Sequence, residues 1–233
     1  MASRSEIIKT LDELGHVLQN LADQGHRGFD CSQGSLEKIA NWGIASKGLS
    51  ETLQDIRLNL GNCQRCRLAT GRTQIVFGSG SSQAKLIFVG EGPGFEEDQQ
   101  GEPFVGPAGQ LLSKIIAAIH LSRKQVYICN IVKCRPPHNR TPQSDEINTC
   151  LPFLERQIAA IQPDFICALG TVAAQTLLNT TESISRLRGR FYDYQGIKLL
   201  PTYHPAYLLR NPDKKRDVWE DMKMLMKEYP YET

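Results

Sequence analysis

The 233-residue sequence has no apolar run long enough to cross a bilayer, and its N-terminus lacks the charged-then-apolar layout of a secretion signal. These absences argue against a membrane-embedded class and predict a cytoplasmic protein. A reducing cytoplasm disfavours disulfides, so the seven cysteines are expected to be thiols, metal ligands or core residues. The chain also has little net charge, +2 at neutral pH, which by itself names no partner.

Phosphate-binding signatures are missing as well. The glycine-rich run from Gly90 to Leu112 reads GEGPGFEEDQQGEPFVGPAGQLL, and no Gly-Lys-Ser/Thr sequence follows its glycines. They are also not spaced as G-x-G-x-x-G at a helix start, the arrangement that binds dinucleotides. Nucleoside triphosphate chemistry is therefore not expected, although these glycines allow backbone N–H groups to approach another ligand closely.

Positive charge is concentrated towards the C-terminus. Between Arg186 and Arg216 there are eight Lys or Arg residues and two acidic residues. His204 lies in this stretch, within the segment PTYHPAYLLRNP. A lone histidine between a strand and a proline is more often structural than functional, but basic residues neutralise phosphates and leucines can wedge between bases. The segment is therefore a candidate for nucleic-acid contacts.

The first fifty residues form a region of their own. Ser3 and Glu6 have the spacing of a capping box, and apolar residues at helical spacing predict a helix over residues 5–23. A glycine- and serine-rich segment follows, which is typical of a linker. We therefore predict a helical extension with a linker over residues 1–50 and one catalytic domain over residues 51–233.

Predicted strands and helices alternate through the rest of the chain. Apolar runs rich in β-favouring residues predict strands, and the segments between them have helical periodicity. This alternation favours an α/β fold with an open sheet, which binds ligands at the carboxyl ends of its strands. The predicted strands are Lys85–Gly90, Val126–Asn130, Asp164–Gly170 and the hairpin Phe191–Tyr194 with Ile197–Thr202, and the predicted helices are Leu49–Leu60, Leu111–Ile119, Ser144–Ile161 and Val172–Leu178.

Four of the seven cysteines are spaced like metal ligands. Cys63 and Cys66 form a C-x-x-C pair before the glycine-rich run, and Cys134 and Cys150 follow it. Four thiolates suit either tetrahedral zinc or an iron-sulfur cluster, and their spacing does not choose between the two. The alternative is that some or all of them are core residues, because free cysteine is commonly buried.

The glycine-rich run also carries a group of acidic side chains, which begins directly after a predicted strand. Glu91, Glu96, Glu97 and Asp98 supply four carboxylates, enough to provide one that orients or deprotonates water. At least two of the four are expected to be solvated side chains without a catalytic role.

In combination these motifs resemble the family 4 uracil-DNA glycosylases, the iron-sulfur branch of the uracil-DNA glycosylase superfamily. The similarity covers residues 60–225 almost without interruption. It implies a three-layer α/β/α sandwich with a four-stranded parallel sheet, and a mainly structural [4Fe-4S] cluster on Cys63, Cys66, Cys134 and Cys150. The matching segments are the C-x-x-C pair, GEGPGFEEDQQGEPFVGPAGQLL, VYICNIVKCRPPHNRTPQSDEINTC, LRGR and PTYHPAYLLRNP.

The resemblance implies an activity and assigns its catalytic residues. Such an enzyme flips uracil out of DNA and hydrolyses the N-glycosidic bond, which releases free uracil and leaves an abasic site. By this resemblance, Glu91 helps to place or activate the attacking water. His204 stabilises negative charge on the departing base.

The same resemblance assigns the uracil pocket. Phe104 matches the aromatic residue on which the flipped uracil stacks, and Asn130 matches the residue that reads the uracil edge through its amide. Gly92 belongs to the pocket wall. Glu97 corresponds to a position at which methylated thymine is excluded.

DNA contacts follow from the basic stretch and the resemblance together. Leu208 or Leu209 is expected to form the wedge that replaces the flipped base, with Arg188 and Arg210 as DNA-binding side chains. The segment RLRGR contains no histidine, which favours hydrolytic turnover over a covalent link to DNA. The partner is uracil-containing DNA, single- or double-stranded, and the default oligomeric state is a monomer.

Two other classes of protein remain open. An iron-sulfur redox or sensor protein that binds nucleic acid without cutting it explains the cysteines and the basic stretch, but leaves Glu91, Phe104, Asn130 and His204 without a purpose. A zinc-stabilised nucleic-acid-binding module is the other alternative. A brown solution of purified protein would favour iron-sulfur, and a colourless solution with zinc would not.

Overall fold

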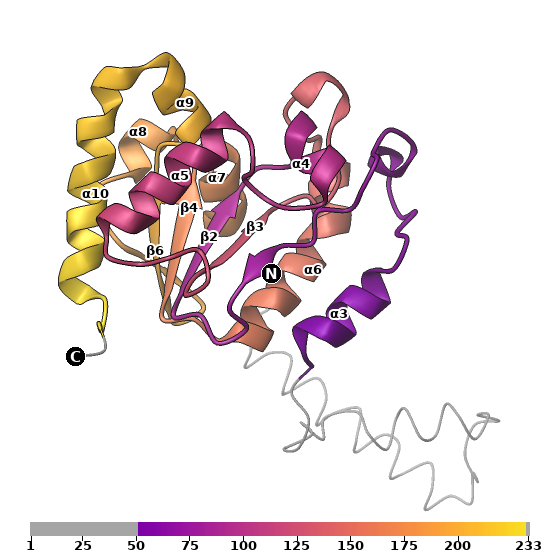
Figure 1. Cartoon of the computed structure of the whole chain (residues 1–233), viewed down its shortest axis with the longest axis horizontal. Helices are drawn as coiled ribbons and strands as arrows, with labels where there is room; N and C mark the ends of the chain where they lie inside the picture. The colour runs from indigo at the N-terminus through magenta and orange to yellow at the C-terminus, as the bar shows by residue number, and fades with distance from the viewer. Residues whose placement is uncertain (1–50, 232–233) are drawn as a thin grey trace, which may run out of the picture. The chain divides into compact units, whose positions relative to one another are not determined.

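A computed structural model describes residues 51–231 (Figure 1). These residues belong to the second of two compact units, Glu51–Thr233. The predicted extension over residues 1–50, with its helix at 5–23, lies outside the described residues. Within residues 51–231, no helix combines the length and the apolar content that crossing a membrane requires.

A six-stranded mixed sheet forms the centre of this unit, with the strand order β1-β3-β2-β4-β6-β5. The inner strands β3, β2, β4 and β6 pair in parallel, and β1 and β5 pair antiparallel at the two edges. The strands are β1 (Ser79–Gly80), β2 (Leu86–Gly90), β3 (Tyr127–Asn130), β4 (Phe165–Leu169), β5 (Tyr192–Tyr194) and β6 (Ile197–Thr202).

The expectation of a four-stranded parallel sheet is therefore corrected to a mixed sheet of six strands. β5 is antiparallel because the two-residue turn of Gln195 and Gly196, both with positive φ, reverses the chain directly into β6. β1 was not predicted, since two residues that include a glycine carry no strand periodicity.

Most of the helices match the sequence pattern. Helix α6 has the predicted bounds, and α5 begins at Pro107, earlier than predicted, because proline is favoured in the first helical turn. Helices α4, α8, α9 and α10 were not predicted. The helices are α3 (Leu53–Leu60), α4 (Phe95–Gln100), α5 (Pro107–Ala118), α6 (Ser144–Ile161), α7 (Thr171–Leu178), α8 (Ile184–Leu187), α9 (Pro205–Arg210) and α10 (Lys215–Glu228), with short 3₁₀ turns η1 (Arg67–Thr70), η2 (Pro137–Asn139) and η3 (Pro212–Lys214).

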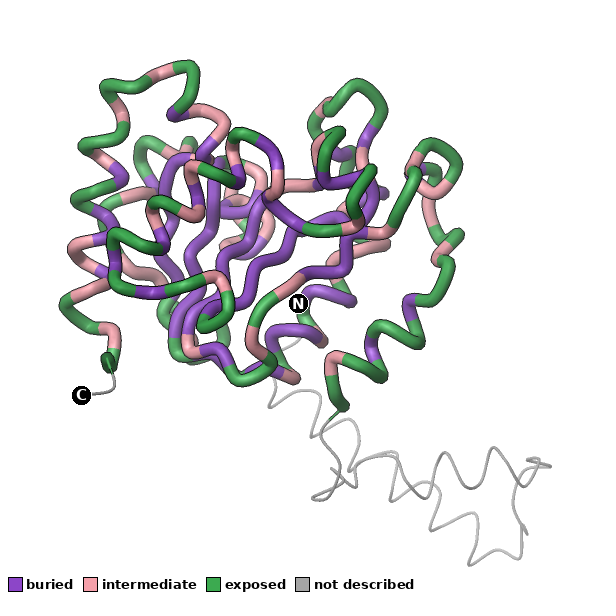
Figure 2. Tube along the Cα trace, viewed as in Figure 1, coloured by how far each residue is buried: buried purple, intermediate pink, exposed green. Residues whose placement is uncertain are grey.

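Helices cover both faces of the sheet, which gives three layers. Successive side chains of β2 alternate: Leu86 and Phe88 pack into a core with α5, α9 and α10, whereas Ile87 and Val89 pack into a core with α6 and α7. Figure 2 shows the consequence, with the central strands buried along their length and each helix buried along one side. Burial on both faces explains the continuous apolar runs that predicted these strands.

Candidate active site

A cavity of about 960 Å³ opens at the carboxyl ends of the parallel strands. The loops after four strands reach it: Glu91 follows β2, Asn130 ends β3, Gly170 follows β4 and His204 follows β6. Parallel strands bring their carboxyl ends to one edge of a sheet, so residues far apart in the sequence meet there. The cavity lies at the edge of the sheet where the sequence predicts the site.

Asn130 presents an unsatisfied acceptor at this edge. Its side chain is 1% exposed, and its Oδ1 is the buried side-chain atom that has no hydrogen-bond partner within residues 51–231. A buried acceptor without a partner is costly, which points to a ligand that donates to it. Space beside it depends on Gly90, where a Cβ would lie 2.4 Å from Oδ1 of Asn130 and 2.5 Å from Cζ of Phe104.

Gly92 also serves a close approach. A Cβ on Gly92 would lie 2.8 Å from Cγ2 of Val132. Its absence lets the loop that carries Glu91 run against the segment that follows Asn130, and the N–H of Val132 donates to the carbonyl of Glu91 at 3.2 Å. The predicted position of Gly92 in the pocket wall agrees with this packing.

Phe104 is held in an unusual backbone conformation beside His204. Its φ is +54°, a region that few non-glycine residues adopt, and its ring lies 5.5 Å from the imidazole at a tilt of 31°. The guanidinium of Arg123 donates to the carbonyls of Pro103 at 2.7 Å and Phe104 at 3.1 Å. These bonds fix the ring at the cavity wall before any ligand arrives.

Glu97 braces the same loop from the other side. Its carboxylate is buried and accepts hydrogen bonds from the N–H groups of Gly94 at 3.1 Å, Val105 at 3.0 Å and Gly106 at 3.1 Å. Both oxygens are thus engaged by backbone. Glu97 lines the cavity, as predicted, and its carboxylate holds the segment that carries Phe104.

His204 is set in one protonation state. The N–H of Ala206 donates to its Nδ1 at 3.1 Å, because His204 is the N-cap of α9. Burial and, to a smaller extent, the charge of Arg210 lower the pKa of His204 to about 4, against an opposing effect of Glu97. The imidazole is therefore neutral at physiological pH with its proton on Nε2, where it can donate a hydrogen bond.

Glu91 is a partly buried carboxylate in the same cavity. Burial raises the pKa of Glu91 above its usual value, and a hydrogen bond from Thr141 counteracts the shift. A carboxylate with a raised pKa is a stronger base than an exposed one. Glu91 is therefore suited to orient water or to take a proton from it.

The two candidate wedge residues have opposite environments. Leu208 is 1% exposed and packs in the core with α5 and α10, whereas Leu209 is 47% exposed at the mouth of the cavity. A side chain in the core is not available to DNA, so the predicted contact by Leu208 is corrected. Arg210 follows Leu209 on the cavity rim, as expected.

Arg188 lies in an ion pair within the protein. Its guanidinium donates to Asp221 at 2.8 and 3.1 Å and stands over the ring of Tyr203. Asp221 is fully buried and also accepts a hydrogen bond from the hydroxyl of Thr202 at 2.6 Å. The guanidinium is thus bonded at the end of β6, the strand that leads into His204, and DNA binding by Arg188 stays a prediction.

The four candidate ligand cysteines lie near one another. Burial raises the pKa of Cys134 to about 11, and Cys150 and Cys66 contribute through their charge, while Cys63 and Cys66 act on Cys150 in the same way. In the described part of the chain, no group of three or more His, Cys, Asp or Glu side chains is arranged to hold a single metal ion. Cys129 and Cys167 are buried strand residues, and Cys31 lies outside the described residues.

N–H donors surround the sulfurs. Arg65 donates to Sγ of Cys63 at 3.3 Å, Arg72 to Sγ of Cys134 at 3.5 Å, and the backbone N–H of Lys133 to Sγ of Cys150 at 3.3 Å. Such donors stabilise thiolate charge on ligating cysteines. Four cysteine thiolates are the usual ligands of an iron-sulfur cluster, so these residues fit such a cluster chemically.

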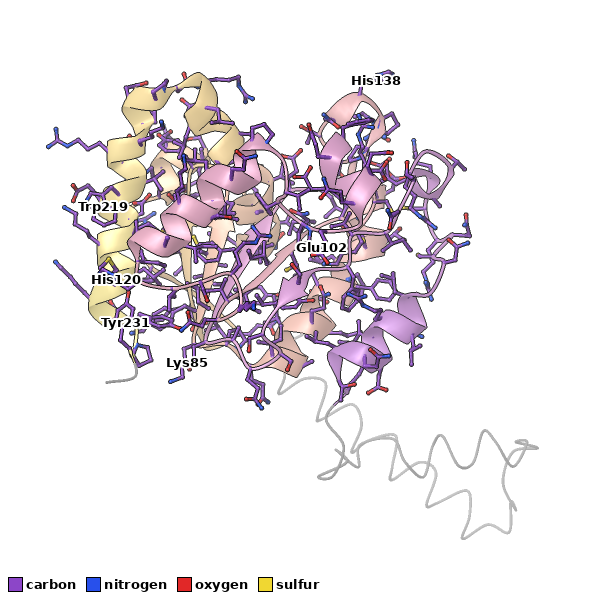
Figure 3. All side chains as sticks on the ribbon, in the orientation of Figure 1. Lys85, Glu102, His120, His138, Trp219 and Tyr231 are labelled. Atoms are coloured by element: carbon purple, nitrogen blue, oxygen red, sulfur yellow. The ribbon has the colours of Figure 1, made fainter. Side chains whose placement is uncertain are left out.

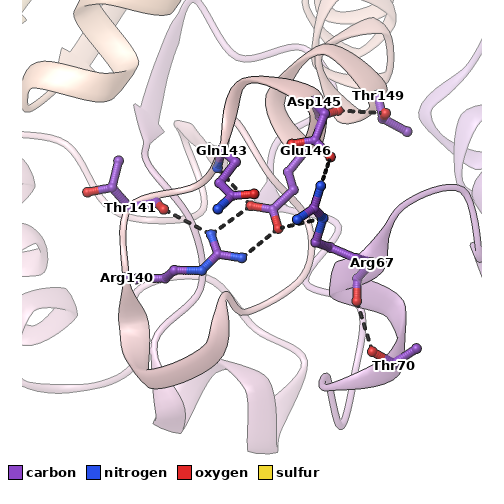
Figure 4. Close-up of polar contacts among 8 residues, drawn as sticks. All are labelled: Arg67, Thr70, Arg140, Thr141, Gln143, Asp145, Glu146 and Thr149. Atoms are coloured by element: carbon purple, nitrogen blue, oxygen red, sulfur yellow. Dashed lines mark hydrogen bonds and ion pairs between the residues drawn. The ribbon is translucent and has the colours of Figure 1, made fainter.

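Ion pairs join the cysteine segments to the cavity wall (Figure 4). Arg67, next to Cys66, pairs with Asp145 at 2.6 Å at the start of α6, the helix that carries Cys150. The neighbouring Glu146 is fully buried and accepts from Arg140 at 2.6 and 2.8 Å. Because Arg140 also lines the cavity, this network connects the cysteine site with the pocket.

Sequence reasoning missed the supporting residues Gly90, Arg123, Thr141 and Asp221. Gly90 matters through the space that its missing side chain leaves. The other three contact residues that are distant in the chain, as Arg123 contacts Phe104 across 19 positions. A single sequence carries no signal for such contacts.

The fold and the site define the class of protein. A family model described as the uracil DNA glycosylase superfamily matches residues 77–223. The chain belongs to the uracil-DNA glycosylase superfamily, and within it to the type-4 uracil-DNA glycosylases, as the motifs indicated.

Three relatives support the narrower assignment. The chain is 41% identical to the type-4 uracil-DNA glycosylase of Archaeoglobus fulgidus over 183 residues, which cover 75% of this chain and 92% of that protein. It is 44% identical to the Thermotoga maritima enzyme over 74% of this chain and 92% of that protein. The Saccharolobus solfataricus enzyme is 46% identical over 69% of this chain and 79% of that protein.

Proposed function

We propose that this protein flips uracil out of DNA and hydrolyses its N-glycosidic bond, releasing free uracil and leaving an abasic site. One observation supports the proposal. Four residues from separate parts of the chain, Glu91, Phe104, Asn130 and His204, line one cavity. In this cavity the buried Oδ1 of Asn130 has no hydrogen-bond partner among residues 51–231. The similar type-4 enzymes are named for the same activity.

Recognition of uracil rests on Asn130 and Phe104. The Oδ1 of Asn130 accepts the N3–H of uracil and the amide N–H₂ donates to a carbonyl of the base, so the edge is read in both directions. The ring of Phe104 stacks on the base. Glu97 acts by holding the backbone around Phe104, and the resulting wall excludes the methyl group of thymine.

Catalysis divides between His204 and Glu91. As the bond between the sugar and N1 of uracil breaks, its electron pair moves to the base, and Nε2–H of His204 donates to the O2 on which negative charge develops. Glu91 orients a water and accepts its proton while the oxygen bonds to the sugar carbon. A neutral histidine is the right form, because its Nε2 proton is present without a buried positive charge.

Contacts with DNA lie at the mouth of the cavity. We assign the wedge to Leu209, which replaces the extruded nucleotide in the stack, and a phosphate contact to Arg210. The nearby lysines Lys214 and Lys215 extend the positive surface along the chain.

We also propose that Cys63, Cys66, Cys134 and Cys150 hold a [4Fe-4S] cluster. The cluster supplies a structural cross-link between the segment before β1 and the start of α6. Its neighbours Arg67, Arg140 and Glu146 carry that support to the cavity wall. As part of the same proposal we expect a cytoplasmic monomer that acts on uracil-containing DNA.

The test uses the holoprotein with single- and double-stranded oligonucleotides that contain one uracil, followed by alkaline cleavage at abasic sites. We expect cleavage at the uracil, none in a matched thymine oligonucleotide, and strong loss in Asn130→Ala. A brown protein with iron bound to the four cysteines supports the cluster. Failure to cut uracil DNA with a loaded cluster would instead favour a nucleic-acid-binding sensor.

A further inference from the structure

Phe95 is an exposed aromatic residue at the edge of the candidate active site. It is the first residue of α4, its side chain is 52% exposed, and it lines the mouth of the cavity. Single exposed apolar residues are common on protein surfaces, so exposure alone carries no function. The residues around Phe95 provide the further evidence.

A guanidinium backs the ring. The Cζ atom of Arg135 lies 5.0 Å from the centre of the Phe95 ring, and Nε of Arg135 donates to Oδ1 of Asn139 at 2.7 Å, which fixes the guanidinium. The ring is thus held from one side while half of its surface remains open to solvent. Figure 3 shows His138, from the same loop, projecting away from the body of the molecule.

The cavity lining also includes residues of α9 to which we assign DNA contacts. Leu209 and Arg210 line the same cavity as Phe95. A strand that places one nucleotide in the cavity would therefore come near two parts of its rim, one with Phe95 and the neighbouring Arg135 and one with Leu209 and Arg210. Both parts offer positive charge for phosphates and an apolar surface for bases.

We propose that Phe95, supported by Arg135, is a stacking platform for a base that neighbours the flipped uracil in single-stranded DNA. This inference rests on the proposed function and adds that single-stranded DNA is a substrate for which the site has a dedicated contact. Every base has a π-face, so an aromatic ring beside positive charge binds single strands with little sequence preference. In a duplex the neighbouring bases remain stacked and paired, so the platform contributes little there.

The experiment measures binding of the cluster-loaded protein, with His204→Ala added to slow excision, to fluorescently labelled oligonucleotides that contain one uracil. We expect Phe95→Ala to weaken single-strand binding by about 5- to 100-fold, the loss of one base–aromatic stack. Duplex binding should change by less than about twofold, because no neighbouring base is free to stack. Phe95→Tyr should retain single-strand affinity, and Phe95→Leu should not.

Trp219→Ala is the matched control. Trp219 is also an exposed aromatic residue, at 41%, and Figure 3 shows it on α10, far from His138. We expect it to bind single strands like the unaltered protein. Equal losses for both DNA forms in Phe95→Ala, or full affinity in Phe95→Leu, would overturn the proposal. Because this experiment measures binding and the cleavage assay measures excision, failure of the platform can be distinguished from failure of the proposed function.

Discussion

The backbone N–H of Ala206 donates a hydrogen bond to Nδ1 of His204 at 3.1 Å. This single contact decides which nitrogen carries the proton, because Nδ1 can accept only when it is unprotonated. The remaining proton sits on Nε2 of a neutral imidazole. Burial favours the same neutral form, so two independent causes agree.

Replacing His204 should affect the chemical step. We expect His204→Ala to slow uracil excision by about 100- to 1,000-fold, since one donor to a developing oxyanion is removed. Single-turnover excision with saturating DNA measures the step directly. Iron content and affinity for uracil-free DNA should stay unchanged, and near-normal excision in this variant would contradict the role of the histidine.

The pH dependence should report Glu91. Its ionised form is the active base and burial raises its pKa, so excision should fall, as pH decreases, at a higher pH than an ordinary carboxyl group would give. Thr141→Val removes a hydrogen bond that lowers this pKa, and it should move the acidic limb to higher pH. Single-turnover rates from about pH 4 to about pH 9 measure both proteins. If the acidic limb of the pH profile does not move in Thr141→Val, it reports the ionisation of a group other than Glu91.

Asn130 should show opposite effects on stability and on activity. Asn130→Ala removes a buried acceptor that has no partner in the described part of the chain, and such an acceptor costs about 1–3 kcal/mol, so the free energy of unfolding should not decrease. Excision should nevertheless be nearly abolished. Denaturant unfolding and the cleavage assay give the two readouts, with the exposed Asn148→Ala as the control that retains activity. A strongly destabilised Asn130→Ala would mean that its amide has a structural partner.

The two adjacent leucines should behave differently. Leu208→Ala creates a core cavity and should cost about 2–5 kcal/mol of stability. Leu209→Ala should change stability by less than about 0.5 kcal/mol but lower excision from duplex DNA more than from single strands, where no stack needs a wedge. Thermal unfolding and parallel assays on both DNA forms distinguish them. Equal loss on both DNA forms in Leu209→Ala would argue against a wedge.

Replacing Arg210 should affect DNA binding, whereas replacing Arg188 should affect stability. Arg210→Gln should weaken DNA binding and reduce the slope of log affinity against log salt by about 1, the value of one phosphate contact. Arg188→Gln leaves Asp221 buried without its ion-pair partner and should cost about 3 kcal/mol of stability, with the salt slope unchanged. Measurements of DNA affinity at several salt concentrations test both variants. A reduced slope of log affinity against log salt in Arg188→Gln would show that Arg188 contacts DNA.

Much of the fold was predictable because it follows from local periodicity. The four parallel strands and α6 appeared as apolar runs and helical spacing, which burial on one or both faces imposes on the sequence. Helix α10 was missed because its apolar face is narrow, with Val218, Met222 and Leu225 among charged residues. The edge strand β1 is too short to show any period.

By itself the sequence determined the strand-helix alternation and the place of the motifs after the strands. Through its resemblance to a known family it also led to the prediction that Glu91, Phe104, Asn130 and His204 are site residues. These follow from patterns that lie within short segments. The tertiary structure decided what depends on burial and distant partners: the protonation state of His204, the choice of Leu209 over Leu208, and the pairing of Arg188 with Asp221. Neighbouring residues such as Leu208 and Leu209 look alike in a sequence, and packing alone sends one into the core and the other towards solvent.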